Sequence, residues 1–122
     1  MALELARIVG SFQLEVTAAK YFLELKRAAE AAGHKVEVNT AYRSREHQER
    51  LYDAYKARKF APPIVAKPGK SAHERGLSVD LNVKKYPEFL AWLRANAHTF
   101  GFFETTPSEP WHWTFISGRV QK

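Results

Sequence analysis

Cysteine is absent from this sequence of 122 residues, so disulfide bonds and thiolate metal sites are excluded. Any metal ion held by side chains must therefore be bound by His, Asp or Glu. Long apolar runs are missing as well, because no stretch approaches the roughly 18 apolar residues of a membrane span. Glu4 and Arg7 also interrupt the N-terminal stretch that a secretory signal would need to keep apolar. We therefore expect a soluble protein, made in the cytoplasm without a signal peptide and without stable membrane insertion.

The composition predicts one compact domain. With 45% hydrophobic residues, a chain of this length can form a single core that buries roughly two thirds of the surface of the unfolded chain. We expect this domain to span residues 1–122, since the sequence has no internal repeat and no low-complexity tract. The 19 Lys+Arg against 13 Asp+Glu give a formal charge of +6, which favours an anionic partner. Nucleic acid, anionic lipid and bacterial wall polymer all meet that condition.

Residue patterns predict an α+β fold. Helical spacing of apolar residues predicts helices, and alternation of apolar with polar residues predicts strands with one buried face. The predicted helices cover residues 14–32, 44–59 and 86–97, and the predicted strands cover residues 35–42, 77–83 and 111–115. Ser44 suits the N-cap of the middle helix. Residues 60–70 contain three prolines and a glycine, which predicts a loop that crosses the surface.

Two histidines and one aspartate are placed to form a metal site. Asp80 and His112 lie on the polar faces of their predicted strands, opposite apolar neighbours. His73 arrives from the preceding loop, so the three side chains can converge at the about 2.0–2.2 Å that zinc requires. Three protein ligands leave a fourth position for water, whose pKa the metal lowers from about 15.7 to about 7. With the carboxylate of Glu109 nearby to accept a proton, this pattern indicates a zinc hydrolase.

The other polar and aromatic residues near these positions are expected to have ordinary roles. A single histidine is more often a surface or hydrogen-bonded residue than a ligand, and we expect this of His34, His47 and His98. Glu74 is expected to be a solvated charge. Trp111 and Trp113 should pack in the core or form a wall of the site, because large aromatic residues in strands usually pack.

Six segments resemble the motifs of the zinc peptidases of the D-alanyl-D-alanine carboxypeptidase type. They are residues 41–44, 48–52, 68–73, 76–80, 100–102 and 109–112. A Ser-x-His with a later Asp, followed by a late Glu-x-x-His, is hard to obtain by chance in this order. Within that group the chain is most similar to the L-alanyl-D-glutamate endopeptidases, many of which are bacteriophage endolysins. The resemblance spans residues 14–116.

The resemblance implies a fold and a set of roles. The fold is α+β, with a small antiparallel sheet that carries the zinc site and packs against helices, as in the LAS and hedgehog-like peptidase folds. His73, Asp80 and His112 would bind Zn²⁺, and Glu109 would act first as general base and then as general acid. Arg43 would project into the cleft, where it could polarise the scissile carbonyl or hold a substrate carboxylate.

Two further residues match motif positions of the same family. Ser71 is expected to hydrogen-bond either the substrate or the loop that carries His73. Gln48 is a candidate for substrate binding, as is Arg43, although a structural role is favoured over a catalytic one for this glutamine.

The function preferred on this resemblance is that of a phage or prophage endolysin that hydrolyses the L-Ala-D-Glu bond of the peptidoglycan stem peptide. Such a protein would be made in the host bacterial cytoplasm, act on the cell wall after release, bind the stem peptide rather than nucleic acid, and work as a monomer. The alternative enzyme is a D-alanyl-D-alanine dipeptidase or carboxypeptidase. A non-enzymatic alternative is a zinc-bearing binding module, since hedgehog-type signalling domains have a similar metal site. Retention of Glu109 and Arg43 argues against that module.

Overall fold

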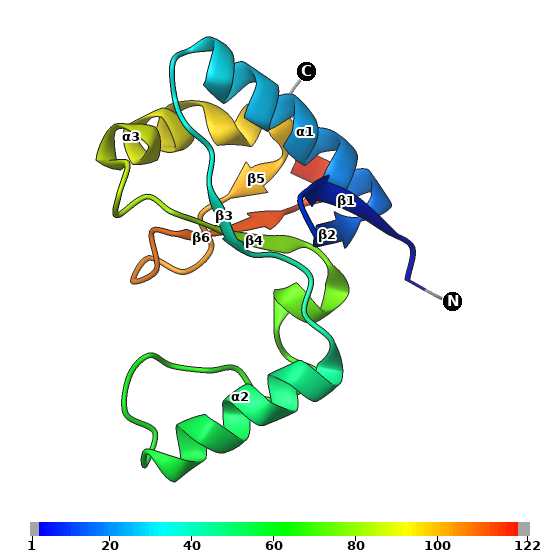
Figure 1. The fold of residues 1–122 in the computed structure, drawn as a ribbon, viewed down its shortest axis with the longest axis vertical. Helices are drawn as coiled ribbons and strands as arrows, with labels where there is room; N and C mark the ends of the chain where they lie inside the picture. The colour runs from blue at the N-terminus through cyan, green and yellow to red at the C-terminus, as the bar shows by residue number, and fades with distance from the viewer. Residues whose placement is uncertain (1–2, 120–122) are drawn as a thin grey trace.

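The computed structural model describes residues 3–119, which form short strands, three helices and single 3-10 turns (Figure 1). The strands are β1 (Leu5–Val9), β2 (Phe12–Glu15), β3 (Val38–Thr40), β4 (Ser78–Leu81), β5 (Phe102–Phe103) and β6 (His112–Phe115). The helices are α1 (Val16–Ala31), α2 (Arg45–Ala57) and α3 (Pro87–Asn96), and the 3-10 turns are η1 (Ala72–Arg75), η2 (Ala97–Phe100) and η3 (Ser117–Arg119). This mixture confirms the predicted α+β class.

The strands form two antiparallel sheets. β1 and β2 pair as a hairpin, and the other four strands form a sheet in the order β3-β4-β6-β5. The register of the two central strands places Asp80 opposite His112 and Ser78 opposite Thr114. Because residues two apart in a strand share a face, and paired residues do too, these four polar side chains lie on one face of the sheet.

The other face of the sheet is apolar and is covered by α1 and α3 (Figure 1). Phe22 of α1 is completely buried and meets Phe102 of β5 edge to face, with ring centroids 5.9 Å apart. Phe89 and Leu93 bring α3 into the same cluster, and each is 1% exposed. Burial of each such side chain stabilises the fold by about 1.5–3 kcal/mol, so this layer holds the central strands in place.

The start of the first helix differs from the prediction. The apolar pattern predicted a helix from residue 14, but α1 begins at Val16, and Leu14 lies in β2 opposite Ala6. Leu14 is completely buried in β2, and a helix packed on the core would bury a leucine as well, so its hydrophobicity does not separate the two structures. The Glu15 side chain ends the strand and caps the helix, because its carboxylate accepts hydrogen bonds from the backbone N–H groups of Thr17 and Ala18, both at 3.0 Å. The β1–β2 hairpin was not predicted.

Helix α2 and the loop that follows it form a separate projection, residues 45–70, which we call the α2 lobe (Figure 1). As predicted, Ser44 caps the helix, its hydroxyl accepting from the His47 N–H at 3.1 Å, and residues 60–70 form a surface loop. Gln48 is the one buried residue of α2. The lobe is therefore held by polar contacts rather than by apolar packing against the core.

The remaining predicted elements are confirmed with shorter bounds. The strand predicted over residues 35–42 is limited to β3, whose pairing with β4 is irregular between Val38 and Thr40. Pro87 occupies the first turn of α3, as its fixed φ favours. Within residues 3–119, no helix is both long enough and apolar enough to cross a bilayer.

Candidate metal centre and cleft

Three predicted ligands converge at the polar face of the central strands. His73 comes from η1, Asp80 from β4 and His112 from β6, and one potential ligand atom of each lies within 4.8 Å of the others. His73 Nε2 is 3.2 Å from Asp80 Oδ1, and His112 Nδ1 is 3.1 Å from the same oxygen. Ligand atoms bound to a tetrahedral zinc at its usual bond lengths are about 3.3 Å apart. The three side chains therefore fit a zinc ion of open, three-ligand type.

The backbone fixes the orientation of the His73 ring. His73 Nδ1 lies 2.8 Å from the Ala41 carbonyl oxygen, which can only accept, so Nδ1 carries the proton and Nε2 presents its lone pair to the site. The ring is 4% exposed. Its backbone is held as well, because the Ser71 hydroxyl accepts from the His73 N–H at 3.2 Å and the Arg43 N–H donates to the His73 carbonyl at 3.0 Å. Of the two roles expected for Ser71, this contact favours the one in the ligand loop.

Asp80 is a charged ligand in a mostly buried position. Burial alone would raise the pKa of its carboxyl group, but its close contacts with the His112 and His73 rings outweigh this and lower the pKa to about 2. The carboxyl group is therefore ionised at neutral pH, as metal binding requires.

Gln48 connects the candidate site to the α2 lobe. Its side chain is 1% exposed, and its amide oxygen accepts from Arg43 Nη1 at 2.7 Å. Its amide nitrogen donates to the Ala66 carbonyl at 2.7 Å, so one side chain holds both the arginine and the loop. This agrees with the structural role favoured for Gln48.

Arg43 is a partly buried cation beside the three ligands. Burial lowers the pKa of its guanidinium group, while the charges of Asp80 and Glu74 oppose that shift, and an arginine stays charged at neutral pH. Its Nε atom is buried and has no hydrogen-bond partner among residues 3–119.

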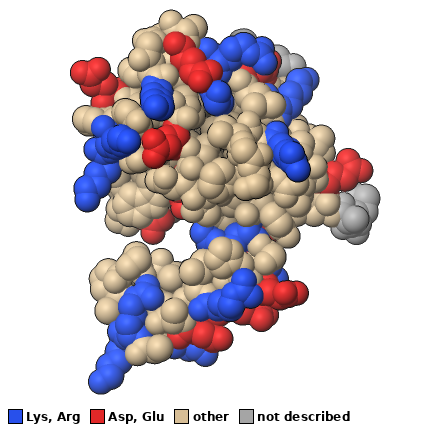
Figure 2. Space-filling view, viewed as in Figure 1, with Lys and Arg blue, Asp and Glu red and all other residues tan. Residues whose placement is uncertain are grey.

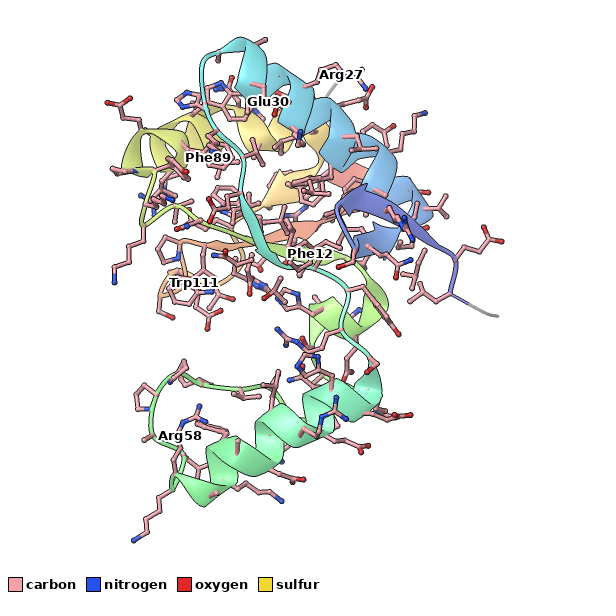
Figure 3. The ribbon with its side chains drawn as sticks, viewed as in Figure 1. Phe12, Arg27, Glu30, Arg58, Phe89 and Trp111 are labelled. Carbon is pink, nitrogen blue, oxygen red and sulfur yellow. The ribbon has the colours of Figure 1, made fainter. Side chains whose placement is uncertain are left out.

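The ligands open into a cleft of about 550 Å³ between the α2 lobe and the rest of the protein. Figure 2 shows the hollow between these two parts, with basic side chains at their junction. Glu109 lines the cleft from the loop before β6, and the His112 N–H donates to its carbonyl at 3.0 Å, which places the two residues in one tight turn. Trp111 lies on the wall that faces the lobe (Figure 3), and Ile64 belongs to the lobe side. Trp111 and Ile64 are 37% and 71% exposed, respectively, so both are accessible to a ligand.

The structure brings all the predicted site residues to this cleft. They are Arg43, Gln48, Ser71, His73, Asp80, Glu109 and His112. Trp111 forms part of the wall and Trp113, at 3% exposed, part of the core. Glu74 was expected to be a solvated charge; it is half-buried, and its carboxylate also accepts from the Gly69 N–H at 2.6 Å, which ties the loop of the α2 lobe to η1.

Sequence reasoning missed several residues of the cleft. The apolar stretch around Ile64 was taken only as part of a loop, and nothing in its composition placed it near the ligands. Ser78 and Thr114 lie two residues from Asp80 and His112 in the same alternating stretches, but only the register shows that they meet each other beside His112. Thr105 also lines the cleft and lies 3.1 Å from Thr114, hydroxyl to hydroxyl.

Comparisons with known proteins agree on one family. Residues 11–118 match the family described as VanY, D-alanyl-D-alanine carboxypeptidase. A D-alanyl-D-alanine carboxypeptidase of Enterococcus faecalis is 30% identical over 93% of this chain and 52% of its own length. The putative carboxypeptidase YodJ of Bacillus subtilis is 26% identical over 78% of this chain and 43% of its own. The chain thus spans about half the length of the curated relatives it matches.

Solved structures show the same similarity. VanYB in complex with D-alanine-D-alanine superposes with a TM-score of 0.81 and 28% identity, over 96% of this chain and 79% of that one. A VanY variant from a VanB-type resistance cassette, solved with Zn(II), also gives 0.81 and 28%, over 95% and 80%. The LD-carboxypeptidase LdcB, at 22% identity and a TM-score of 0.74 over 95% of this chain and 65% of that one, shows the shared fold.

Proposed function

Because the chain belongs to the VanY family of D-alanyl-D-alanine carboxypeptidases, we propose that it is a zinc metallopeptidase that removes the terminal D-alanine from peptidoglycan stem peptides. The observation that carries this proposal is the convergence of His73, Asp80 and His112 in a cleft that Glu109 and Arg43 also line. A relative with 28% identity was solved with Zn(II), and the donor set here has the composition and spacing that zinc prefers.

Each side chain of the cleft has a role in this chemistry. Zinc held by the three ligands would supply a Lewis acid that polarises the scissile carbonyl and lowers the pKa of a water to about 7. Glu109 would take a proton from the attacking water as the new C–O bond forms, and would give it to the departing amine as the C–N bond breaks. Arg43 would stabilise the negative charge that develops on the carbonyl oxygen, or would hold the substrate's terminal carboxylate.

The cleft also suits a peptide that extends beyond the scissile bond. It is open along the α2 lobe, and its two walls present Ile64 and Trp111 to solvent. Apolar side chains on both walls can contact the aliphatic parts of the stem peptide, while Arg43 binds its charged end. The net charge of +6 would favour approach to an anionic wall.

The comparisons favour the carboxypeptidase, which the sequence analysis held as its alternative, over the L-Ala-D-Glu endopeptidase that it preferred. Endolysin activity, a phage origin, production in the cytoplasm, action as a monomer and a single domain over residues 1–122 stay predictions. Both enzymes would use the same metal and the same general base, so the bond that is cut must be identified directly.

The test is digestion of a synthetic stem pentapeptide ending in D-Ala-D-Ala by the zinc-loaded protein, with the products identified by mass spectrometry. The proposal predicts a tetrapeptide and free D-alanine. Release of L-alanine from the other end would show the endopeptidase, and release of intact D-Ala-D-Ala would show a dipeptidase. No cleavage of any wall peptide while zinc stays bound would favour the binding module.

Glu109→Gln is the matched variant for this assay. Glutamine keeps the size and polarity of the side chain but cannot accept a proton, so the rate should fall by about 10²-fold to 10⁴-fold. Zinc content and thermal stability should stay close to those of the parent. Cleavage within about threefold of the parent rate would show that another group is the base.

A further inference from the structure

Four polar side chains share one face of β4 and β6, and the metal site accounts for only two of them. Asp80 and His112 are one cross-strand pair, and Ser78 and Thr114 are the next. Ser78 is completely buried, and its Oγ lies 2.8 Å from Thr114 Oγ1. A buried hydroxyl must place its proton on an acceptor, so this pair has a defined hydrogen-bonding requirement.

The hydroxyl pair also meets the second nitrogen of His112. Thr114 Oγ1 lies 3.3 Å and Ser78 Oγ 3.5 Å from His112 Nε2, on the side of the ring away from Asp80. Thr114 Oγ1 is also 3.1 Å from Thr105 Oγ1, and Thr105 is exposed at the cleft. Three hydroxyl groups from β4, β6 and the loop after β5 thus run from the buried centre of the sheet to solvent. We call Ser78, Thr114 and Thr105 the hydroxyl chain.

Metal binding and the contact with Asp80 favour different positions of the proton on the His112 ring. Nδ1 faces Asp80 and converges with His73 Nε2, so it must be free of a proton to bind a metal. The Asp80 carboxylate, 3.1 Å away, attracts a proton to that same nitrogen. Unless Nε2 has an acceptor of its own, the neutral ring will favour the tautomer that cannot bind.

The proton positions of the hydroxyl chain follow from its contacts. If His112 carries its proton on Nε2, Ser78 cannot donate to that nitrogen, and its one other partner among residues 3–119 is Thr114. Thr114, accepting from Ser78 and His112, can then donate to Thr105, which is exposed and can donate to water in turn. The protons therefore point in one direction, from Ser78 through Thr114 to Thr105. With the reverse direction, the Ser78 proton has no acceptor except His112 Nε2, which gives the wrong tautomer.

We propose that Ser78, Thr114 and Thr105 are positioning residues, which hold the proton of His112 on Nε2 and thereby present Nδ1 to zinc. His73 needs no such device, because the Ala41 carbonyl can only accept. A hydroxyl group can either donate or accept. At His112 the hydroxyl chain must therefore donate in one fixed direction, toward Thr105, so that an acceptor is left for Nε2. The proposal rests on the zinc site of the proposed function but not on its peptidase activity.

Zinc affinity of the purified protein tests the hydroxyl chain. Competition with a chromophoric chelator at neutral pH gives the dissociation constant for zinc alone. Thr114→Val removes the hydroxyl and keeps the shape, and loss of such an outer partner of a ligand weakens metal binding by about 10-fold to 100-fold. Ser78→Ala should act in the same direction. Thr114→Ser restores the hydroxyl and should return the affinity to within about threefold of the parent.

Thr106→Val is the matched control, because Thr106 lines the same cleft and lies outside the hydroxyl chain. Its zinc affinity should equal that of the parent. Far-UV circular dichroism of the metal-free variants shows whether each one folds. Should Thr114→Val fail to fold, the zinc affinity of Ser78→Ala and the ¹⁵N spectrum of the zinc-loaded parent decide the question.

The tautomer can be read directly from ¹⁵N spectra of histidine-labelled, zinc-loaded parent protein. We expect a protonated Nε2 and a metal-bound Nδ1 at His112. Coordination through Nε2, or an affinity of Thr114→Val within about twofold of the parent, would overturn the inference. If the parent releases D-alanine while the variant keeps its zinc affinity, this inference alone fails. If the parent binds no zinc, the proposed function fails with it.

Discussion

Replacing Gln48 with methionine tests whether one buried side chain holds both the arginine of the site and the wall of the cleft. A guanidinium group only donates, and a carbonyl only accepts, so the Gln48 amide has one possible orientation between Arg43 and Ala66. Methionine keeps the length of the side chain and loses both hydrogen bonds. Because the Nε atom of Arg43 is already buried without a partner within residues 3–119, a second guanidinium nitrogen would lose its partner as well.

The expected loss can be worked out from the two contacts. A hydrogen bond to a charged group contributes about 1.5–3 kcal/mol, and one between neutral groups about 0.5–1.5 kcal/mol. The free energy of unfolding should therefore fall by about 2–4 kcal/mol, measured by urea denaturation. Limited proteolysis should cut residues 59–70 faster, since the loop loses its contact at Ala66. Release of D-alanine should fall by about 10-fold or more, because a displaced Arg43 is poorly oriented for the reaction.

Two companion variants separate the contributions. Gln48→Glu keeps an acceptor for Arg43 but turns a carboxylate oxygen toward the Ala66 carbonyl, so the loop should loosen while the arginine stays in place. Glu49→Met changes an exposed neighbour on the same helix and should alter stability by no more than about 0.5 kcal/mol. The reasoning is refuted if Gln48→Met matches the Glu49 variant in stability, in proteolysis and in D-alanine release.

Three further predictions concern the metal, the turn after His73 and the lobe wall. Asp80→Ala should lose both zinc and activity, since it leaves two ligands, whereas near-stoichiometric zinc by elemental analysis would show that the ligand set is different. Gly76→Ala should lower the free energy of unfolding by about 2–3 kcal/mol, because residue 76 has a φ of +71° and an added Cβ would lie 2.7 Å from the backbone nitrogen of Glu15. The control is Gly33→Ala, at a φ of +90° with nothing within 4 Å of the added Cβ, and its free energy of unfolding should fall by only about 1 kcal/mol. Equal losses for the two variants in urea denaturation would contradict the close approach at Gly76. Ile64→Ser should raise KM for the pentapeptide about threefold or more while changing stability by under about 0.5 kcal/mol, and an unchanged KM would remove Ile64 from the substrate-binding wall.

The local structure was largely readable from the sequence because its signals lie within a few residues of one another. Ser44 predicted a helix start, Pro87 lies in the first turn of its helix, and the alternation around Asp80 and His112 predicted polar strand faces. The missed β1–β2 hairpin is instructive. A strand or a helix can bury Leu14, so the apolar pattern could not decide between them. The helix begins after residue 15, where the Glu15 side chain caps it.

The sequence by itself determined which chemistry is possible. Without cysteine, a metal must be bound by His, Asp or Glu, and His73, Asp80 and His112 were identified as candidate ligands by spacing and by family resemblance. It also supplied Glu109 and Arg43 as candidate groups for proton transfer and charge stabilisation. These are properties of residue types and of short motifs, so they do not depend on long-range contacts.

Only the tertiary structure decided how these groups are arranged. The register of β4 and β6 places Asp80 beside His112, 32 positions away, and Ser78 beside Thr114, 36 positions away. The Ala41 carbonyl, also 32 positions away, orients the ring of His73. Such pairings depend on how the apolar face of the sheet packs against α1 and α3, since a shift of one residue would turn the polar residues into the core. No local pattern encodes that choice, because it is made by the packing of the whole core.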